Sequence, residues 1–272
     1  MMNHRELLKN KHRIIIKVGT ALITHEDGKI NLLRIEMLAR VIAGLKNEGK
    51  EIILITSGAV GAGMGVLNLN TKPESIVEKQ ALASVGQAAV LRMYETFFKE
   101  YNQVIGQVLL TRDGIEHEVR RTNARNTILR LLEMGVIPVI NENDAISTVE
   151  IEFGDNDMLS AQVAELINAD LLIILTTTDG VFTDNPHENS DAKQVSTVMK
   201  AGTDLKEIIT SGKSGLGSGG MQSKIEAAEL CRQKNIDVVI AEGTDANVVY
   251  DILEGRQSGT LFVSKSTEMK SS

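Results

Sequence analysis

The sequence contains one cysteine, no tryptophan and no long apolar run, and each shortage excludes a class of protein. Cys231 alone cannot build a disulfide framework or a cysteine-rich zinc site, which favours a reducing compartment. No apolar stretch approaches the ~20 residues that span a bilayer, and residues 1–13 lack the apolar core of a secretory signal. We therefore expect a soluble, cytoplasmic protein without a membrane partner.

Basic and aromatic residues are also scarce. Lys and Arg number 29 against 36 Asp and Glu, the net charge is −7, and aromatics make up 3% of the chain. Nucleic-acid surfaces usually show a basic stripe with stacking rings, so we expect a small-molecule ligand and no nucleic acid. The length of 272 residues suits one large α/β domain or two modest ones.

Short β-branched runs alternate with helix-length segments along the chain. The intervening segments carry apolar residues at helical spacing, for example Leu33, Met37, Val41 and Leu45. Strands this uniformly apolar are buried on both faces, so the pattern predicts a mainly parallel sheet with helices on both sides. The expected strands are 14–18, 52–56, 104–110, 136–140, 171–176 and 238–241.

Three segments depart from this alternation. Residues 148–153 alternate polar and apolar side chains, which predicts a half-exposed hairpin strand outside the main sheet. Residues 185–220 are polar, and five of the nine residues from 212 to 220 are glycine, so we expect a partly mobile loop. Residues 265–272 resemble a frayed tail.

Two expected strands run into glycine, at Gly19 and at Gly58. In open α/β sheets ligands bind at this edge, where glycine lets backbone N–H groups approach an anion, although glycine also simply makes tight turns. The dinucleotide fingerprint starting at Gly61 fails at Val66, and the phosphate-loop ending of 207–214 has Glu207 in place of the first glycine. We therefore expect a phosphate ligand without either motif.

Charged residues stand at the ends of several elements. Lys17 closes an apolar strand and needs an anionic partner unless its amine reaches solvent. Lys224 precedes the expected helix 225–234 and by itself would be a surface residue. Asp144 follows a strand, and 155–157 opens the expected helix 158–167. This acidic set suits a pocket for an ammonium group, lysines or magnesium, although a single aspartate at a helix start can serve only the helix dipole.

Together these segments resemble the amino acid kinase family. The resemblance covers nearly the whole chain, and the Asn-Glu-Asn-Asp and Gly-Asp-Asn-Asp segments are typical of the members that phosphorylate glutamate. The matching segments are 16–20, 56–63, 140–144, 153–157, 175–177, 217–224 and 259–262.

The resemblance implies a three-layer αβα sandwich around an open, mainly parallel sheet. It implies a single domain over 1–265, with glutamate bound in the N-terminal half, ATP in the C-terminal half, and a tail at 266–272. Many such members carry a further C-terminal PUA domain. This chain stops about ten residues after Phe262, so we expect it to lack that domain.

The implied reaction converts ATP and L-glutamate into ADP and L-glutamyl 5-phosphate, the first step of proline biosynthesis. A carboxylate of pKa about 4.3 is ionised at neutral pH and needs no general base. By resemblance, Lys17 and Lys224 stabilise the transferring phosphoryl group and Asp157 orients them. Ser57, Asp144 and Asn156 match substrate-binding positions. The ATP-binding positions are Lys17, Thr176, Thr177, Ser218, Gly219, Gly220, Met221, Gln222, Ser223 and Lys224.

The same resemblance implies further ligands and partners. Mg²⁺ accompanies the nucleotide, with its protein ligands left open, proline is expected as a feedback inhibitor, and a homo-oligomer, dimer or tetramer, is expected. A rival interpretation is a related kinase acting on acetylglutamate, aspartate, carbamate or a nucleoside monophosphate. Asp144 argues against acetylglutamate and nucleotides, because it suits a free ammonium group. Another rival is a non-catalytic regulator that binds glutamate, proline or ATP, against which Lys17 and Lys224 argue.

Overall fold

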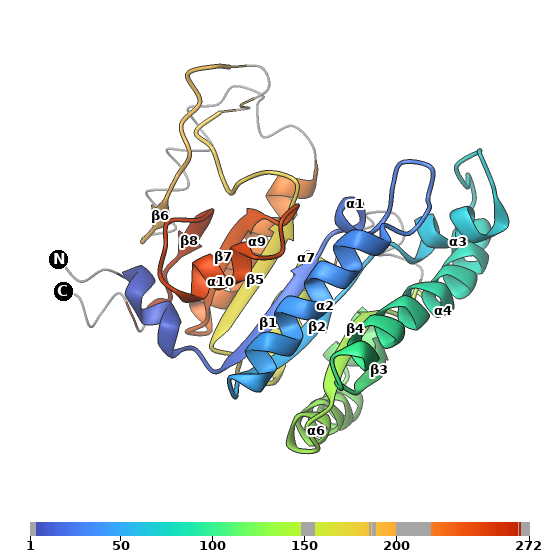
Figure 1. Cartoon of the computed structure of the whole chain (residues 1–272), viewed down its shortest axis with the longest axis horizontal. Coiled ribbons are helices and arrows are strands. Elements are labelled where there is room, and N and C mark those ends of the chain that lie inside the picture. Colours follow the sequence, from blue (N-terminus) through green and yellow to red (C-terminus); the bar gives the residue numbers. More distant parts are fainter. Residues whose placement is uncertain are drawn as a thin grey trace.

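The computed structural model describes residues 4–147, 156–184, 186, 189–199, 219–265 and 267. Its centre is an eight-stranded sheet in the order β3-β4-β2-β1-β5-β7-β8-β6 (Figure 1). All six expected strands are present and pair in parallel, whereas β8 joins β7 in antiparallel fashion. The strands are β1 Arg13–Val18, β2 Glu51–Ile55, β3 Ile105–Leu110, β4 Ile137–Glu142, β5 Leu171–Thr176, β6 Thr197–Val198, β7 Asp237–Glu242 and β8 Thr260–Phe262.

Helices cover both faces of the sheet, which confirms the three-layer arrangement. One apolar cluster joins α2, α4 and α10 to the face seen in Figure 1, and a second joins α6, α7 and α9 to the other face. None of the described helices is long and apolar enough to cross a membrane. The helices are the 3-10 helix η1 His4–Asn10, α1 Thr20–Ile23, α2 Leu32–Asn47, α3 Ala59–Leu67, α4 Ile76–Glu100, α5 Arg112–Glu116, α6 Glu118–Glu133, α7 Asp157–Leu166, α9 Gly219–Gln233 and α10 Val248–Leu253.

Strand parity decides which layer each side chain of β1 meets. Ile14 and Ile16 join the cluster beneath α2, while Ile15 joins the cluster beneath α7 and α9. Successive side chains of a strand point to opposite faces, so Lys17 shares the face of Ile15. The charged side chain of Lys17 is therefore directed toward α7 and α9.

Two helices differ from the sequence expectation. In α2, Val41 and Leu45 are buried as expected, whereas Leu33 in the first turn is 65% exposed and the buried stripe also includes Ile35 and Leu38. Helix α9 begins at Gly219, so Lys224 sits in its second turn and does not precede the helix.

The other irregular segments are described only in part. The expected hairpin strand at 148–153 lies outside the described residues, as do 200–218 and most of 265–272. Residues 189–196 are irregular apart from one bridge between Phe182 and Gln194.

Helices α3 and α4 cross in close contact because both carry glycine at the crossing. A Cβ atom on Gly63 would lie 2.0 Å from the carbonyl oxygen of Leu82, and one on Gly86 would lie 1.8 Å from that of Ala59. No side chain fits either position without moving a backbone. This crossing holds α3, which follows the glycine turn of β2, firmly against α4.

Candidate active site

The carboxyl edge of the sheet carries the start of several helices. Gly19 caps α1 after β1, and Gly58 caps α3 after β2 with a left-handed backbone of φ 85°. Helices α7 and α9 start at the same edge with Asp157 and Gly219. The edge therefore gathers helix N-termini, which attract anions.

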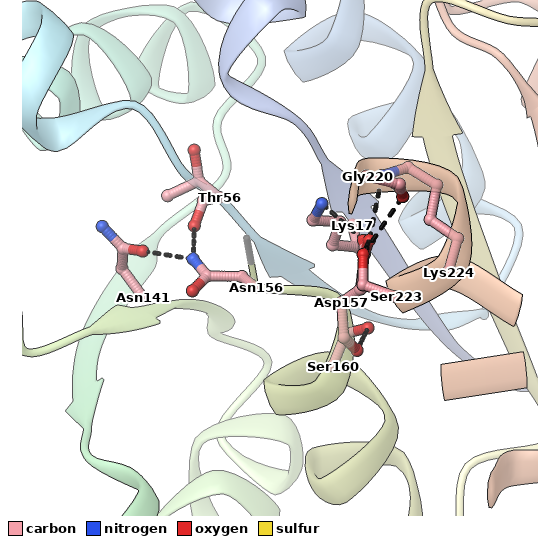
Figure 2. A network of polar contacts seen from close by, with 9 residues as sticks. All are labelled: Lys17, Thr56, Asn141, Asn156, Asp157, Ser160, Gly220, Ser223 and Lys224. Atoms are coloured by element: carbon pink, nitrogen blue, oxygen red, sulfur yellow. Dashed lines mark hydrogen bonds and ion pairs between the residues drawn. The ribbon is translucent and has the colours of Figure 1, made fainter. Parts of the chain in front are cut away.

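A buried charged cluster occupies this edge between β1, α7 and α9. Lys17 Nζ lies 2.6 Å from Asp157 Oδ1, and Lys224 Nζ lies 2.9 Å from Asp157 Oδ2. The side chains of Lys17 and Asp157 are 1% and 0% exposed. Figure 2 shows both lysines converging on the one carboxylate. The lysine of β1 is therefore paired and buried, and its extension to solvent is excluded.

Neighbouring groups hold this cluster in place. Ser223 Oγ donates to Asp157 Oδ2 at 2.9 Å, and Lys224 Nζ donates to the carbonyl of Gly220 at 2.8 Å. Asp157 is the first residue of α7, so its carboxylate also favours the helix N-terminus. Two cations around one carboxylate leave a local charge of +1, which suits a phosphate.

A chain of amide groups continues from the charged cluster toward α4. Asn156 Nδ2 donates to the carbonyl of Thr56 and to Asn141 Oδ1, both at 2.6 Å (Figure 2). Asn141 Nδ2 in turn donates to Gln87 Oε1 at 2.5 Å. The hydroxyl of Thr56 pairs with that of fully buried Tyr94 at 3.1 Å, and burial raises the pKa of Tyr94.

Ser57 stands beside this chain with an unusual hydroxyl. Its side chain is buried, yet Oγ has no hydrogen-bond partner among the residues that the structure describes. Buried hydroxyls are nearly always bonded, because leaving one unsatisfied costs about 1–3 kcal/mol. A hydroxyl left in this way is suited to a ligand.

Asp144 lies in the turn after β4 and is half-buried. It lines a cavity of about 430 Å³ together with Gln87 and Glu142, and the cavity is bounded by α4 and β3. Lys17, Asp157 and Lys224 do not line this cavity. Asp144 and the charged cluster thus occupy different parts of the site, connected through Gln87 and Asn141. Asp155 lies outside the described residues.

The residues expected to bind ATP divide into three groups. Gly219, Gly220 and Ser223 lie at the start of α9, where Ser223 contacts Asp157, and Thr176 ends β5 next to β1, with Thr177 directly after it. Met221 instead packs against the apolar cluster, and exposed Gln222 pairs with Glu226 on the helix surface. Ser218 lies outside the described residues.

Sequence reasoning did not assign a role to Thr56, Gln87 or Tyr94. Thr56 acts through its backbone carbonyl, which any residue could supply. Gln87 and Tyr94 lie within the 25-residue helix α4, and a polar residue inside an amphipathic helix gives no local sign of its partner. Only the packing of α4 against β2 and β4 identifies them.

Comparisons with known proteins agree with this architecture. Residues 12–242 match the amino acid kinase family. The glutamate 5-kinase of Clostridium perfringens is 47% identical over 268 residues, which cover 97% of this chain and all of that protein. The glutamate 5-kinase of Caldanaerobacter subterraneus subsp. tengcongensis is 48% identical over 92% of this chain and 68% of its own length. The solved UMP kinase of Bacillus anthracis has the same fold at 17% identity, with a TM-score of 0.64 and coverage of 94% and 97%. The chain belongs to the amino acid kinase family.

Proposed function

We infer that this protein is a glutamate 5-kinase, which transfers the γ-phosphoryl group of ATP to the side-chain carboxylate of L-glutamate in the first step of proline biosynthesis. The observation that carries the inference is the 47% identity to a glutamate 5-kinase across 97% of the chain. The buried cluster of Lys17, Asp157 and Lys224 supports it, because it supplies what this transfer needs.

The chemistry requires positioning and charge cancellation more than proton transfer. A glutamate carboxylate oxygen attacks the γ-phosphorus, and the bond from that phosphorus to the ADP oxygen breaks. The attacking carboxylate is already ionised at neutral pH, so no base is required. Lys17 and Lys224 offset the negative charge of the transferring group and its two oxygen partners. Asp157 keeps both ammonium groups aimed before the substrates arrive.

The amide groups and Ser57 supply the contacts for glutamate in this proposal. Ser57 Oγ donates to a substrate carboxylate, which satisfies its buried hydroxyl. Asp144 pairs with the α-ammonium group, and Asn156 contributes its Oδ1. ATP lies along Thr176, Thr177 and the start of α9.

Magnesium is proposed to arrive with the nucleotide. No three His, Cys, Asp or Glu side chains gather into a metal site in the described part of the chain. Both oxygens of Asp157 already accept hydrogen bonds from lysines. Mg²⁺ commonly relies on phosphates and water with few protein ligands, so the described residues suit an ion held chiefly by ATP.

Regulation and assembly complete the proposal. Proline is expected to compete at or near the glutamate site, since the two share an α-amino acid carboxylate. A homo-oligomer, dimer or tetramer, and a cytoplasmic location are also proposed.

A substrate panel tests the function. The purified protein is incubated with ATP, Mg²⁺ and, in turn, glutamate, N-acetylglutamate, aspartate or carbamate, and ADP release is followed in a coupled assay. Hydroxylamine traps the acyl phosphate as a hydroxamate. We expect turnover and hydroxamate with glutamate. Preference for another acceptor would identify a different kinase. If no acceptor led to release of ADP, the result would support a non-catalytic regulator.

The lysines provide the matched variants. Lys17→Met and Lys224→Met are each expected to reduce turnover more than tenfold while circular dichroism stays unchanged, because each removes a charge needed as transfer proceeds. Near-normal kcat in either variant would remove that lysine from the mechanism.

A further inference from the structure

The amide chain between α4 and Asn156 has a fixed direction, which starts at a backbone carbonyl. A carbonyl oxygen only accepts hydrogen bonds, so the atom of Asn156 that lies 2.6 Å from the carbonyl of Thr56 must be the NH₂ group. The orientation of this side chain therefore follows from chemistry, without any ambiguity between nitrogen and oxygen.

The same logic fixes the next residue. The second N–H of Asn156 points to an atom of Asn141 at 2.6 Å, which must be the acceptor Oδ1. The backbone N–H of Glu142 donates to the same oxygen at 2.9 Å. Two donors thus hold Asn141 Oδ1, and a flipped Asn141 would bring N–H against N–H at both contacts.

Gln87 is the end of the chain on α4. Asn141 Nδ2 faces it and needs an acceptor, which Gln87 Oε1 supplies at 2.5 Å. Gln87 also lines the cavity that holds Asp144. The residue thus connects the turn that carries Asp144 with the start of α7.

The direction of the chain determines what a ligand meets at Asn156. Both of its N–H groups are engaged, and no described residue donates to its Oδ1. Because both N–H groups are engaged, Oδ1 is the one polar atom of this amide that is left for a ligand, and the residue as a whole is 8% exposed. A carbonyl oxygen accepts from an ammonium group, as does the carboxylate of Asp144.

We propose that Gln87 is a positioning residue of the glutamate site, which acts through Asn141 to hold Asn156 Oδ1 toward the substrate ammonium group. This proposal rests on the proposed function for the identity of the substrate. It predicts that the property required at position 87 is a hydrogen-bond acceptor, independent of charge or size.

Three substitutions at position 87 distinguish a requirement for an acceptor from a requirement for charge or size. Gln87→Glu keeps an acceptor oxygen, Gln87→Met keeps the shape but replaces the oxygen by a weakly accepting sulfur, and Gln87→Lys places a donor against Asn141 Nδ2. We expect the KM for glutamate to rise least for Gln87→Glu, about two- to tenfold for Gln87→Met and more for Gln87→Lys. If simple attraction of the anionic substrate governed the site, the order would reverse, with Gln87→Lys the best of the three.

Two readouts distinguish positioning from damage to the fold. The KM for ATP, and the inhibition constant of glutarate, which lacks the ammonium group, should both stay within about twofold of the wild type. Gln103 provides the control, because it lies just beyond the end of α4 and its Nε2 makes a different hydrogen bond, to Asn47 Oδ1 at 3.1 Å. The same three substitutions at Gln103 should leave every constant unchanged.

A spectroscopic measurement tests the chain without reference to the substrate. In ¹⁵N spectra of the whole protein, the side-chain amide signals of Asn141 and Asn156 should shift in Gln87→Met and Gln87→Lys and remain in place in the Gln103 variants. Unmoved signals, equal KM values for the three Gln87 variants, or parallel rises for glutamate and ATP would each overturn the proposal. Shifted signals in a protein that does not phosphorylate glutamate would support the hydrogen-bond chain and refute the proposed function alone.

Discussion

Replacing Asp157 by asparagine tests how the buried lysines are held. Asparagine keeps one acceptor oxygen and presents an NH₂ group to one of the two ammonium groups. The local charge rises from +1 to +2 in a region where Lys17 and Asp157 are almost wholly buried. Removing one partner of a buried ion pair typically costs about 3–5 kcal/mol. Lys224 keeps the carbonyl of Gly220 and is slightly exposed, so we expect the lower part of this range.

The assay is thermal unfolding at pH 7. At about 2–4 °C per kcal/mol for chains of this size, a loss of about 3–4 kcal/mol in Asp157→Asn should lower the Tm by roughly 6–16 °C. Asp113→Asn is the matched control, because Asp113 also lies in the first turn of a helix and pairs with Arg120, but is 71% exposed. An exposed pair contributes at most about 1 kcal/mol, so this variant should unfold close to the wild type.

Anion binding supplies the decisive comparison. Saturating tripolyphosphate should raise the Tm of Asp157→Asn by more than it raises that of the wild type, since the variant lacks one negative charge and the net charge of the site is one unit more positive. Turnover should nevertheless fall, because the lysines are no longer oriented. A variant that unfolds like Asp113→Asn, or that responds less to tripolyphosphate than the wild type, would refute the role assigned to Asp157.

Further predictions concern the substrate, the helix crossing and the cysteine. Asp144→Asn should weaken glutamate binding by about 1.5–3 kcal/mol, or roughly tenfold to over a hundredfold, with little change in the KM for ATP; equal losses for both substrates would contradict the pairing of Asp144 with the ammonium group. Gly86→Ala should destabilise the protein by about 2 kcal/mol or more in urea unfolding, whereas Gly61→Ala, whose Cβ would lie 3.7 Å from the nearest atom, should stabilise it by up to about 1 kcal/mol. Burial raises the pKa of the Cys231 thiol to about 12, so the native state holds this proton more tightly than the unfolded chain. The contribution of this thiol to the free energy of unfolding is fully present below pH 9 and is lost between pH 9 and pH 12, by up to about 1.4 kcal/mol per pH unit. In urea unfolding, the stability of Cys231→Ala should therefore decline less steeply with pH over that range than the stability of the wild type.

Much of the fold could be predicted from the chain, because six of the eight strands are largely apolar and separated by helical segments. The two strands at one end of the sheet could not: β8 and β6 have three and two residues, too few for any periodicity. The close crossing of α3 and α4 could not be predicted either, because Gly63 and Gly86 are seen to be required only once the two helices are in contact.

The site was predictable where a residue conflicted with its surroundings. A lysine in the apolar strand β1 requires an anion, and a carboxylate at the start of α7 was available to serve as one. Composition and spacing alone could not pair Lys17 with Asp157, which are 140 residues apart, and the family resemblance supplied that expectation. Gln87 conflicts with nothing around it, so its part in the amide chain became visible only from the position of Asn141.

The long sequence separation within the charged cluster has a consequence for synthesis on the ribosome. Lys17 lies in β1, at the middle of the sheet, and its carboxylate is made 140 residues later. A nascent chain that ends before residue 157 has neither α7 nor its carboxylate, so packing that face of β1 would bury the ammonium group of Lys17 without its partner, at a cost of several kcal/mol. In addition, the edge of β1 that pairs with β5 has no hydrogen-bonding partner strand until β5 has been synthesised. The N-terminal half is therefore expected to stay loosely folded until the start of α7 and β5 have emerged, so the two halves mature as one cooperative unit.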